Sequence, residues 1–180
     1  NDGHDYIFEA IDKGAIAVLA NGRSPATKIV PILQVKNPRK VMSKIAANFY
    51  DNPSKELNII GITGTNGKTT TTQIIDQILK YCNKSSSSLG TLGFNSPTGI
   101  ISTGFTTPES IDLQQIFRTL KDGGIDYVPM EVSSHAIDLH RIDNINFNIG
   151  IFTNLSIDHL DYHGNMENYF NSKLNFFKKL

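Results

Sequence analysis

One stretch constrains the fold of this 180-residue chain more than any other: residues 57–81, LNIIGITGTNGKTTTTQIIDQILKY. It opens with an apolar run at 57–62, which is typical of a buried strand. A turn rich in Gly and Thr follows at 63–69, and after it Ile and Leu recur at helical spacing. The order strand, glycine loop, helix is typical of a phosphate-binding loop, in which backbone N–H groups and a helix N-terminus face an anion.

The loop departs from the strict G-x-x-x-x-G-K-[ST] pattern of phosphate loops. The first Gly of that pattern would fall at Ile62, and Gly64 instead gives the shorter G-x-x-G-K-T. In a phosphate site Lys68 would reach the terminal phosphates, and the Thr69 hydroxyl would be a ligand for Mg²⁺. A simple helix-capping turn explains Gly64 but gives Lys68 no task, so we interpret the loop as a phosphate site.

Composition limits the class of protein. The chain is 39% hydrophobic and 19% charged, which is ordinary for a globular protein. Its 17 basic residues balance 17 acidic ones, so we expect no binding to nucleic acid or to a membrane surface. The single Cys82 excludes an internal disulfide and fits a reducing compartment, which predicts a cytoplasmic protein. No signal peptide or membrane span is recognisable, and the missing initial Met predicts a fragment.

Strands alternate with helices along the chain, which predicts α/β domains with mostly parallel sheets covered by helices. Residues 1–53 contain two predicted strands, at 15–20 and 29–35, and end in a turn-forming D-N-P-S linker. We place a domain boundary there. Residues 1–53 would then be the end of one α/β domain, and residues 54–180 the first half of a second domain that holds the phosphate loop.

Three groups of polar side chains stand at or just after predicted strand ends. They are the loop around Lys68, the E-V-S-S-H run that begins at Glu131, and the N-L-S-I-D-H run that ends at His159. The last two follow the strands predicted at 125–132 and 147–155. Because ligands bind beyond the carboxyl ends of parallel strands, we expect all three groups at one edge. There Glu131 would be an oxygen ligand and His159 a nitrogen ligand of a metal–phosphate centre.

The histidines allow a second metal hypothesis. His159 and His163, and more loosely His135 and His140, have the spacing of paired ligands and would suit zinc. Gly164 directly after His163 disfavours a continuing helix, which weakens this hypothesis.

Lys173 lies on the aromatic side of a helix predicted at 166–179. Most lysines in such a position extend the ammonium group to solvent. A buried lysine with a lowered pKa would be chemically unusual. The spacing of the residues alone does not decide between the two.

Four strings in the chain resemble the Mur ligase family of peptidoglycan synthesis. They are GITGTNGKTTT, TTPE, EVSSHAIDLHR and FTNLSIDHLDYHGNMENYFNSK, in the order of the family, and the resemblance covers essentially the whole chain. It implies a three-domain enzyme. Residues 1–53 would belong to the N-terminal domain that binds the UDP substrate, and residues 54–180 to the central ATP-binding domain, with the C-terminal ligase domain absent.

The resemblance also implies the reaction, which is ATP-dependent amide formation through an acyl phosphate in peptidoglycan precursor synthesis. Within the family the strings are most similar to the ligase that adds the third amino acid, meso-diaminopimelate or lysine, to UDP-N-acetylmuramoyl-L-Ala-D-Glu. The implied partners are that UDP-N-acetylmuramoyl-dipeptide and a diamino acid, with ATP and Mg²⁺ as cofactors and no nucleic acid or membrane. A monomer is expected, and the fragment alone is expected to be inactive.

Site residues are assigned by the same resemblance. Lys68 and Lys173 would be catalytic, the latter as a carbamate able to hold Mg²⁺. The residues expected to bind ATP are Gly64, Thr65, Asn66, Gly67, Lys68, Thr69 and Thr70. The expected metal ligands are Thr69, Glu131, His159 and Lys173. The residues expected to contact the UDP-muramoyl substrate are Thr106, Thr107, Ser133 and Arg141.

The chain departs from the family pattern at two places. Leu139 stands where the family has a polar substrate-contacting residue, usually Gln. Residues 85–88 are all Ser, where the family generally has an apolar strand. The composition of residues 83–88 predicts a flexible loop.

Three other functions are alternatives for this sequence. Folylpolyglutamate synthetase shares the loop and the acyl phosphate chemistry, but the strings HLDYHG and FYDNPS favour the muramoyl enzyme. A GTPase switch would need the guanine-reading N-K-x-D, and Asn83-Lys84-Ser85-Ser86 lacks the Asp. A nucleotide-binding module without catalysis is the third alternative for a fragment.

Overall fold

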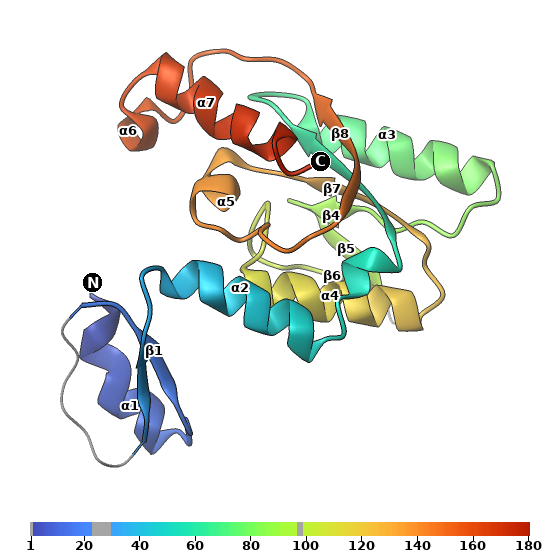
Figure 1. Cartoon of the computed structure of the whole chain (residues 1–180). Helices are drawn as coiled ribbons and strands as arrows, with labels where there is room; N and C mark the ends of the chain where they lie inside the picture. Colours follow the sequence, from blue (N-terminus) through green and yellow to red (C-terminus); the bar gives the residue numbers. More distant parts are fainter. Residues whose placement is uncertain (1, 23–29, 97–98) are drawn as a thin grey trace. The chain divides into compact units, whose positions relative to one another are not determined.

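The computed structural model of the chain (Figure 1) describes residues 2–22, 30–96 and 99–180. Most of the loop predicted at 21–27 and the start of the strand predicted at 29–35 therefore lie outside the described residues. Within the described ranges, no helix combines the length and the apolar character that crossing a membrane requires.

The chain divides into two compact units, residues 1–42 and 43–180. The division falls inside a helix, α2 (Pro38–Phe49). The domain boundary predicted from the sequence lies after residue 53, and as a boundary between complete domains it stays a prediction.

The first unit is a small α/β piece. A 3-10 turn, η1 (Gly3–Tyr6), leads into helix α1 (Ile7–Asp12). Strands β1 (Val18–Ala20) and β2 (Ile32–Gln34) then pair in parallel. Both strands lie within the ranges predicted for them and are shorter.

The second unit is built on one six-stranded sheet in the order β6-β5-β4-β7-β3-β8. Strand β3 pairs in parallel with β7 on one side and with β8 on the other, and β4 continues the parallel part beyond β7. Strands β5 and β6 add an antiparallel edge. The mostly parallel α/β fold predicted from the sequence is confirmed. The strands are β3 (Asn58–Thr63), β4 (Leu89–Gly90), β5 (Gly93–Ser96), β6 (Gly99–Ile101), β7 (Tyr127–Glu131) and β8 (Phe147–Phe152).

Helices pack around this sheet (Figure 1). Helix α4 (Ser110–Asp122) buries Leu113, Phe117 and Leu120 completely in the core. A 3-10 turn, η2 (Pro53–Lys55), precedes β3. The helices of the unit, besides the last part of α2, are α3 (Lys68–Tyr81), α4 (Ser110–Asp122), α5 (Ser134–Asp138), α6 (Leu160–His163) and α7 (Met166–Phe177).

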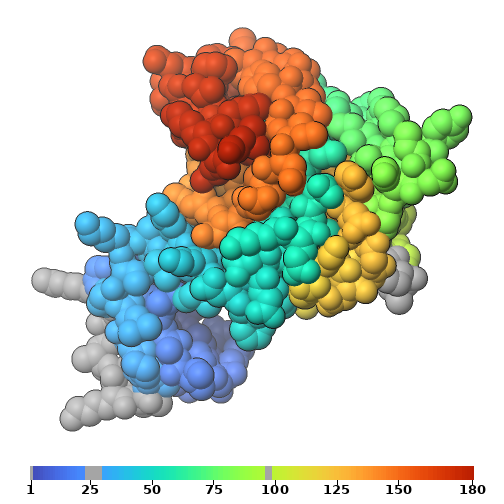
Figure 2. Space-filling view, turned by 45° about the vertical axis from the view of Figure 1, so that its right-hand side comes forward, coloured from blue at the N-terminus to red at the C-terminus, as the bar shows by residue number. Residues whose placement is uncertain are grey.

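Helix α7 packs close to the sheet because two strands have a glycine where they face it. A Cβ at Gly61 of β3 would lie 2.4 Å from Phe176 Cζ, and one at Gly150 of β8 would lie 3.1 Å from Phe177 Cε1. The ring of Phe176 fills this space and is fully buried. Figure 2 shows the red atoms of α7 directly against the orange atoms of the segment around β8. This packing fixes the helix that carries Lys173.

Helix α3 forms where it was predicted, but its buried face differs from the apolar one. Ile74 and Ile78 are 54% and 57% exposed, whereas Thr72 and Asp76 are buried. The recurrence of Ile and Leu therefore identified the helix without identifying the side that packs on the sheet.

The prediction of a flexible loop at residues 83–88 is wrong for residues 86–88. Residues 86–88 are buried, and Ser86 makes a parallel bridge with Tyr127, so the run lies beside β7 and leads into β4. Buried hydroxyl groups need hydrogen-bond partners, and composition does not reveal them. The partners are Asp76 Oδ1 for Ser86 Oγ at 2.7 Å, Asn95 O for Ser87 Oγ at 3.0 Å, and Gln73 Nε2 for Ser88 Oγ at 3.0 Å.

We predict that Ser86→Ala lowers the free energy of unfolding by about 1–3 kcal/mol, because the buried Asp76 carboxylate loses its hydroxyl donor. Urea unfolding followed by circular dichroism measures this. The matched control is Ser102→Ala at an exposed serine, which should change stability by less than about 0.5 kcal/mol. Equal losses in the two variants would contradict the packed arrangement of the serine run.

Candidate active site

The loop between β3 and α3 is shaped by two glycines with unusual backbone angles. Gly64 and Gly67 have φ values of +144° and +81°, which side chains other than hydrogen rarely allow. A Cβ at Gly64 would lie 2.0 Å from Thr153 Oγ1, so the neighbouring segment also requires glycine. Helix α3 begins at Lys68, and the free N–H groups of its first turn point toward the loop. Such donors fit a bound phosphate.

The segment after β8 holds this loop in place. The Asn154 side chain accepts from Asn66 N and donates to Asn66 O, both at 3.0 Å. Asn154 O accepts from Thr65 N at 2.9 Å, and Thr153 Oγ1 donates to Asn66 O at 2.7 Å. The sequence placed Asn154 at a strand end but did not reveal these contacts. The strand predicted to run to 155 instead ends at Phe152, which frees residues 153–155 for them.

Two lysine ammonium groups share one carbonyl oxygen at the loop. Lys68 Nζ donates to Gly64 O at 3.0 Å and to Thr65 O at 2.8 Å. Lys173 Nζ donates to the same Gly64 O at 2.9 Å and lies 4.4 Å from the centroid of the Tyr169 ring. Lys173 is 1% exposed, so its ammonium group does not extend to solvent.

Burial and mutual repulsion act on both amines. Burial lowers the pKa of Lys68 from its ordinary value, and the charges of Glu131 and Asp158 oppose this in part. Burial and the charge of Lys68 lower the pKa of Lys173 to about 8. An anion bound at the loop would stabilise the charged form of both amines.

Glu131 ends β7 beside the start of α3. Its carboxylate is 2% exposed and accepts three hydrogen bonds. They come from Thr69 Oγ1 to Oε2 at 2.9 Å, from Thr91 N to Oε1 at 2.9 Å and from Thr91 Oγ1 to Oε2 at 3.3 Å. The Thr69 and Glu131 oxygens are as far apart as neighbouring ligands of an octahedral Mg²⁺ with bonds of about 2.0–2.1 Å. These two predicted ligands thus fit one hard cation.

His159 lies on the Lys173 side of the same edge. It has φ +52°, immediately before α6, and its side chain is 46% exposed. Its ring centroid lies 6.2 Å from that of Tyr169, the residue whose ring also contacts Lys173. The structure thus groups these two predicted metal ligands around one tyrosine, whose hydroxyl in turn donates to Thr65 Oγ1 at 3.2 Å.

The zinc hypothesis gains no support from the described residues. They contain no group of three or more His, Cys, Asp and Glu side chains placed to hold a metal. His163 is buried, and its Nε2 lies 2.9 Å from Ser134 Oγ while its Nδ1 lies 3.5 Å from Asp138. Helix α6 ends at His163, with Gly164 at φ +78° as predicted. His163 therefore ties α6 to α5.

The four residues predicted to contact substrate gather beyond β7. Thr107 Oγ1 donates to the last carbonyl of β7 at 2.9 Å and accepts from Ser133 N at 3.1 Å. Arg141 Nη1 donates to Thr107 O at 3.0 Å, and Thr106 Oγ1 lies 3.1 Å from Thr91 Oγ1. Thr107 is 1% exposed, and its buried hydroxyl connects the end of β7 to Ser133.

The Arg141 guanidinium group already has partners within the chain. Arg141 Nη2 lies 2.8 Å from Glu109 Oε1, and its guanidinium carbon lies 5.3 Å from the centroid of Phe105. Leu139 is half-buried at the end of α5. Thr70, the last residue of the predicted ATP set, is exposed in the first turn of α3.

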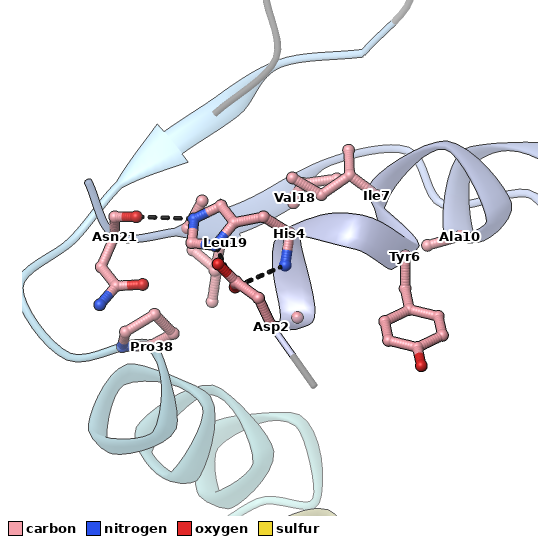
Figure 3. A pocket seen from close by; sticks show the side chains of 11 residues that line it. Asp2, His4, Tyr6, Ile7, Ala10, Val18, Leu19, Asn21 and Pro38 are labelled. Atoms are coloured by element: carbon pink, nitrogen blue, oxygen red, sulfur yellow. Dashed lines mark hydrogen bonds and ion pairs between the residues drawn. The ribbon is translucent and has the colours of Figure 1, made fainter. Parts of the chain in front are cut away.

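The first unit has a separate cavity of about 290 Å³, shown in Figure 3. The His4 ring closes one side, with Nδ1 2.6 Å from Asp2 Oδ1 and Nε2 2.7 Å from Asn21 O. The hydrogen bond with Asp2 raises the pKa of His4. Val18 and Leu19 of β1 are among the apolar lining residues. No pattern in the sequence indicates this cavity.

Comparison with known proteins gives one family and a consistent set of relatives. Residues 62–180 match the model of the Mur ligase middle domain. The chain is similar to proteins named UDP-N-acetylmuramoyl-L-alanyl-D-glutamate--2,6-diaminopimelate ligase. One from Geobacter metallireducens is 45% identical over 99% of this chain and 35% of its own length. Another from Clostridioides difficile is 47% identical over 99% of this chain and 37% of its own length.

Solved structures agree with this. A structure of a UDP-N-acetylmuramoyl-L-alanyl-D-glutamate--2,6-diaminopimelate ligase matches 98% of this chain and 35% of its own length, with a TM-score of 0.79 and 30% identity. A MurF ligase from Thermotoga maritima, in complex with ADP, covers 99% of the chain and 38% of its own length, with a TM-score of 0.59 and 23% identity, which shows the fold alone. The chain thus spans about a third of the length of the relatives it matches.

We predict that Asn154→Ala speeds amide hydrogen exchange at Thr65 and Asn66 by about tenfold or more, because the variant removes the side chain that pairs with Asn66. Asn154→Asp keeps the acceptor for Asn66 N and should show a smaller effect. Hydrogen–deuterium exchange with mass spectrometry measures this, with the peptide of α4 as an internal reference. Unchanged exchange in Asn154→Ala would show that the segment after β8 does not hold the loop.

Proposed function

The chain belongs to the Mur ligase family, and from this premise we propose that it is part of an ATP-dependent ligase that extends a UDP-N-acetylmuramoyl peptide. The substrates would be UDP-N-acetylmuramoyl-L-Ala-D-Glu and diaminopimelate, the amino acid in the names of the relatives. Residues 1–53 would complete a domain for the UDP substrate, and residues 54–180 would begin the ATP-binding domain. A C-terminal ligase domain would complete the enzyme in a protein of the length of the relatives.

One observation supports the proposal above the others: the glycine loop, the half-buried Lys68, the buried Lys173 and a buried carboxylate meet at one sheet edge. That set suits a reaction between anions. In the proposed reaction a substrate carboxylate oxygen attacks the γ-phosphorus of ATP, and ADP leaves. The amine of the new amino acid then attacks the acyl carbon, phosphate leaves, and the amine proton is lost to solvent.

The residues of the chain would act by positioning and by charge. The loop from Gly64 to Thr69 and the N–H groups of α3 would bind the phosphates, and Lys68 would turn from Gly64 O toward them. A carboxylate and a triphosphate repel each other, and positive groups fixed in a buried site offset that repulsion without reorganising. The lowered pKa of Lys68 fits this task. Burial destabilises the charged ammonium group, and a bound anion beside it would stabilise that charged form again.

Divalent cations would be held by the side chains that the sequence predicts. Thr69 and Glu131 would hold Mg²⁺ at the start of α3, and His159 with Lys173 would hold a second ion. When bound, Mg²⁺ neutralises phosphate charge and polarises the phosphoryl oxygens. Both sets of side chains lie at the edge where the loop opens.

Lys173 would act as a carbamate. Its amine is buried against Gly64 O and the Tyr169 ring, and no carboxylate within the described residues forms an ion pair with it. The neutral amine would attack the carbon of CO₂, a C–N bond would form, and one proton would pass to solvent. The product is an oxygen anion where an unpaired ammonium stood, which suits a cation ligand.

The groups beyond β7 would contact the muramoyl peptide. Thr106, Ser133 and Arg141 would present polar atoms to it, and Thr107 would hold their backbone in place. The balanced charge and the single Cys82 support a cytoplasmic enzyme. We propose a monomer, which gel filtration with light scattering tests.

We predict that the complete protein releases phosphate only when the muramoyl-dipeptide nucleotide, ATP, Mg²⁺ and the diamino acid are all present. Lys68→Ala should lower kcat by about 10²-fold or more, because a fixed charge facing the transferred phosphoryl group is lost. Lys84→Ala, at an exposed lysine beyond α3, is the matched control and should keep full activity. A coupled assay for phosphate measures both.

Two outcomes of that assay would count against the proposal. Turnover that survives Lys68→Ala unchanged would contradict the role of the loop. An equal rate with a folate substrate in place of the muramoyl nucleotide would contradict the substrate assignment.

We also predict that Lys173 carries a carbamate. Protein equilibrated with ¹³C-bicarbonate should show one carbamate carbon signal in the NMR spectrum, and Lys173→Arg should lack it because a guanidinium does not add CO₂. Lys178→Arg, at an exposed lysine of the same segment, is the control and should retain the signal. A wild-type spectrum without the signal, at saturating bicarbonate and Mg²⁺, would contradict the prediction.

A further inference from the structure

We propose that Thr91 is a positioning residue for the Glu131 carboxylate and that Gly90 provides the space in which this carboxylate sits. Neither residue was assigned a role from the sequence. The proposal rests on the proposed function in one respect, which is that Glu131 holds a divalent cation together with a nucleotide.

Thr91 supplies two of the three hydrogen bonds to the buried carboxylate. Its backbone N–H occupies Oε1 at 2.9 Å, and its hydroxyl reaches Oε2 at 3.3 Å. The third donor is Thr69 Oγ1, on Oε2 at 2.9 Å. Since Oε1 is taken from the Thr91 side, the other oxygen is left directed at Thr69, the second predicted cation ligand. The carboxylate orientation is therefore set from the turn after β4 as well as from the start of α3.

Position 90 requires glycine because a side chain would not fit there, and not because of its backbone conformation. Its φ lies outside the left-handed region, so another residue could adopt the same backbone there. A Cβ at this position, however, would lie 2.2 Å from Glu131 Oε1 and 2.7 Å from Glu131 Cδ. The carboxylate is packed against the glycine, and any side chain at position 90 would displace it.

The Thr91 hydroxyl also reaches the substrate side. It lies 3.1 Å from Thr106 Oγ1, in the loop before α4. One hydroxyl thus contacts both the predicted cation ligand and a residue predicted to contact the muramoyl substrate.

Direct cation binding tests this independently of ligase activity. The probe is Mn²⁺, followed by electron paramagnetic resonance, with the complete protein and a non-hydrolysable ATP analogue. We expect Thr91→Val, which keeps the backbone N–H and removes the hydroxyl, to raise the Kd of Mn²⁺ by about tenfold. Thr91→Ser retains the hydroxyl and should stay within about twofold of wild type. Gly90→Ala should raise the Kd further than Thr91→Val.

The controls separate positioning from a general structural effect. Gly3→Ala is the matched glycine variant, because a Cβ there meets nothing within 4 Å and its backbone is not left-handed. It should bind Mn²⁺ as wild type does. Binding of the nucleotide without metal should stay unchanged in all variants, since the phosphate loop itself is untouched. If Gly90→Ala does not fold, the pair Thr91→Val and Thr91→Ser decides.

Wild-type Mn²⁺ affinity in Thr91→Val would overturn the proposal, and so would equal losses in Thr91→Val and Thr91→Ser. A wild-type protein that binds Mn²⁺ with nucleotide but forms no amide bond would contradict the proposed function and leave the positioning role standing. A wild-type protein that binds no Mn²⁺ with nucleotide would overturn both.

Discussion

The parallel pairing of β3 with β7 and β8 is the constraint on which the site depends. Its register places Ile62 opposite Glu131 and Thr63 opposite Phe152, so the three strands end level with one another. The glycine loop, the buried carboxylate and the segment that clamps the loop all begin at these ends. A slip of the register would move Glu131 away from Thr69 and the clamp away from the loop. The site is therefore a property of the sheet more than of any one motif.

The lysine ammonium groups at this edge form hydrogen bonds with neutral carbonyl groups and not with carboxylates. Two ammonium groups meet at Gly64 O, a neutral acceptor, although a carboxylate lies nearby on Glu131. Their pKa values are lowered by burial, which means that the folded chain bears an electrostatic cost there. Functional sites commonly keep such groups because a ligand of opposite charge relieves the cost. A triphosphate with its cations would do so here.

Local patterns in the sequence predicted much of this arrangement. The strand–loop–helix unit is contained in one continuous stretch, and the strand ends followed from apolar runs, so the common edge could be predicted. Contacts between distant segments could not. The clamp of Asn154 on Asn66 joins positions far apart in the chain, and nothing near Asn154 signals it. The sequence left open whether Lys173 reaches solvent, and the aromatic packing of α7 places it inside.

The serine run shows the same limit in another form. Its composition is that of a loop, yet residues 86–88 are buried because Asp76 and other partners supply hydrogen bonds. A polar helix face is expected to face solvent. The polar face of α3 instead packs against the serine run. Helical spacing and composition each describe a segment alone, whereas burial of polar groups is decided by pairs of segments.

Hydroxyl groups contact a buried carboxylate both at the serine run and at Glu131, and for Glu131 the physical reason is clear. The Glu131 carboxylate is held by Thr69 and Thr91, and no Lys or Arg side chain in the described residues forms an ion pair with it. A cationic partner would hold the carboxylate equally well but would cancel the charge that attracts a divalent ion. Neutral donors satisfy its lone pairs and leave that charge in place. Threonine in these positions thus keeps the carboxylate both fixed and available, which a salt bridge would not.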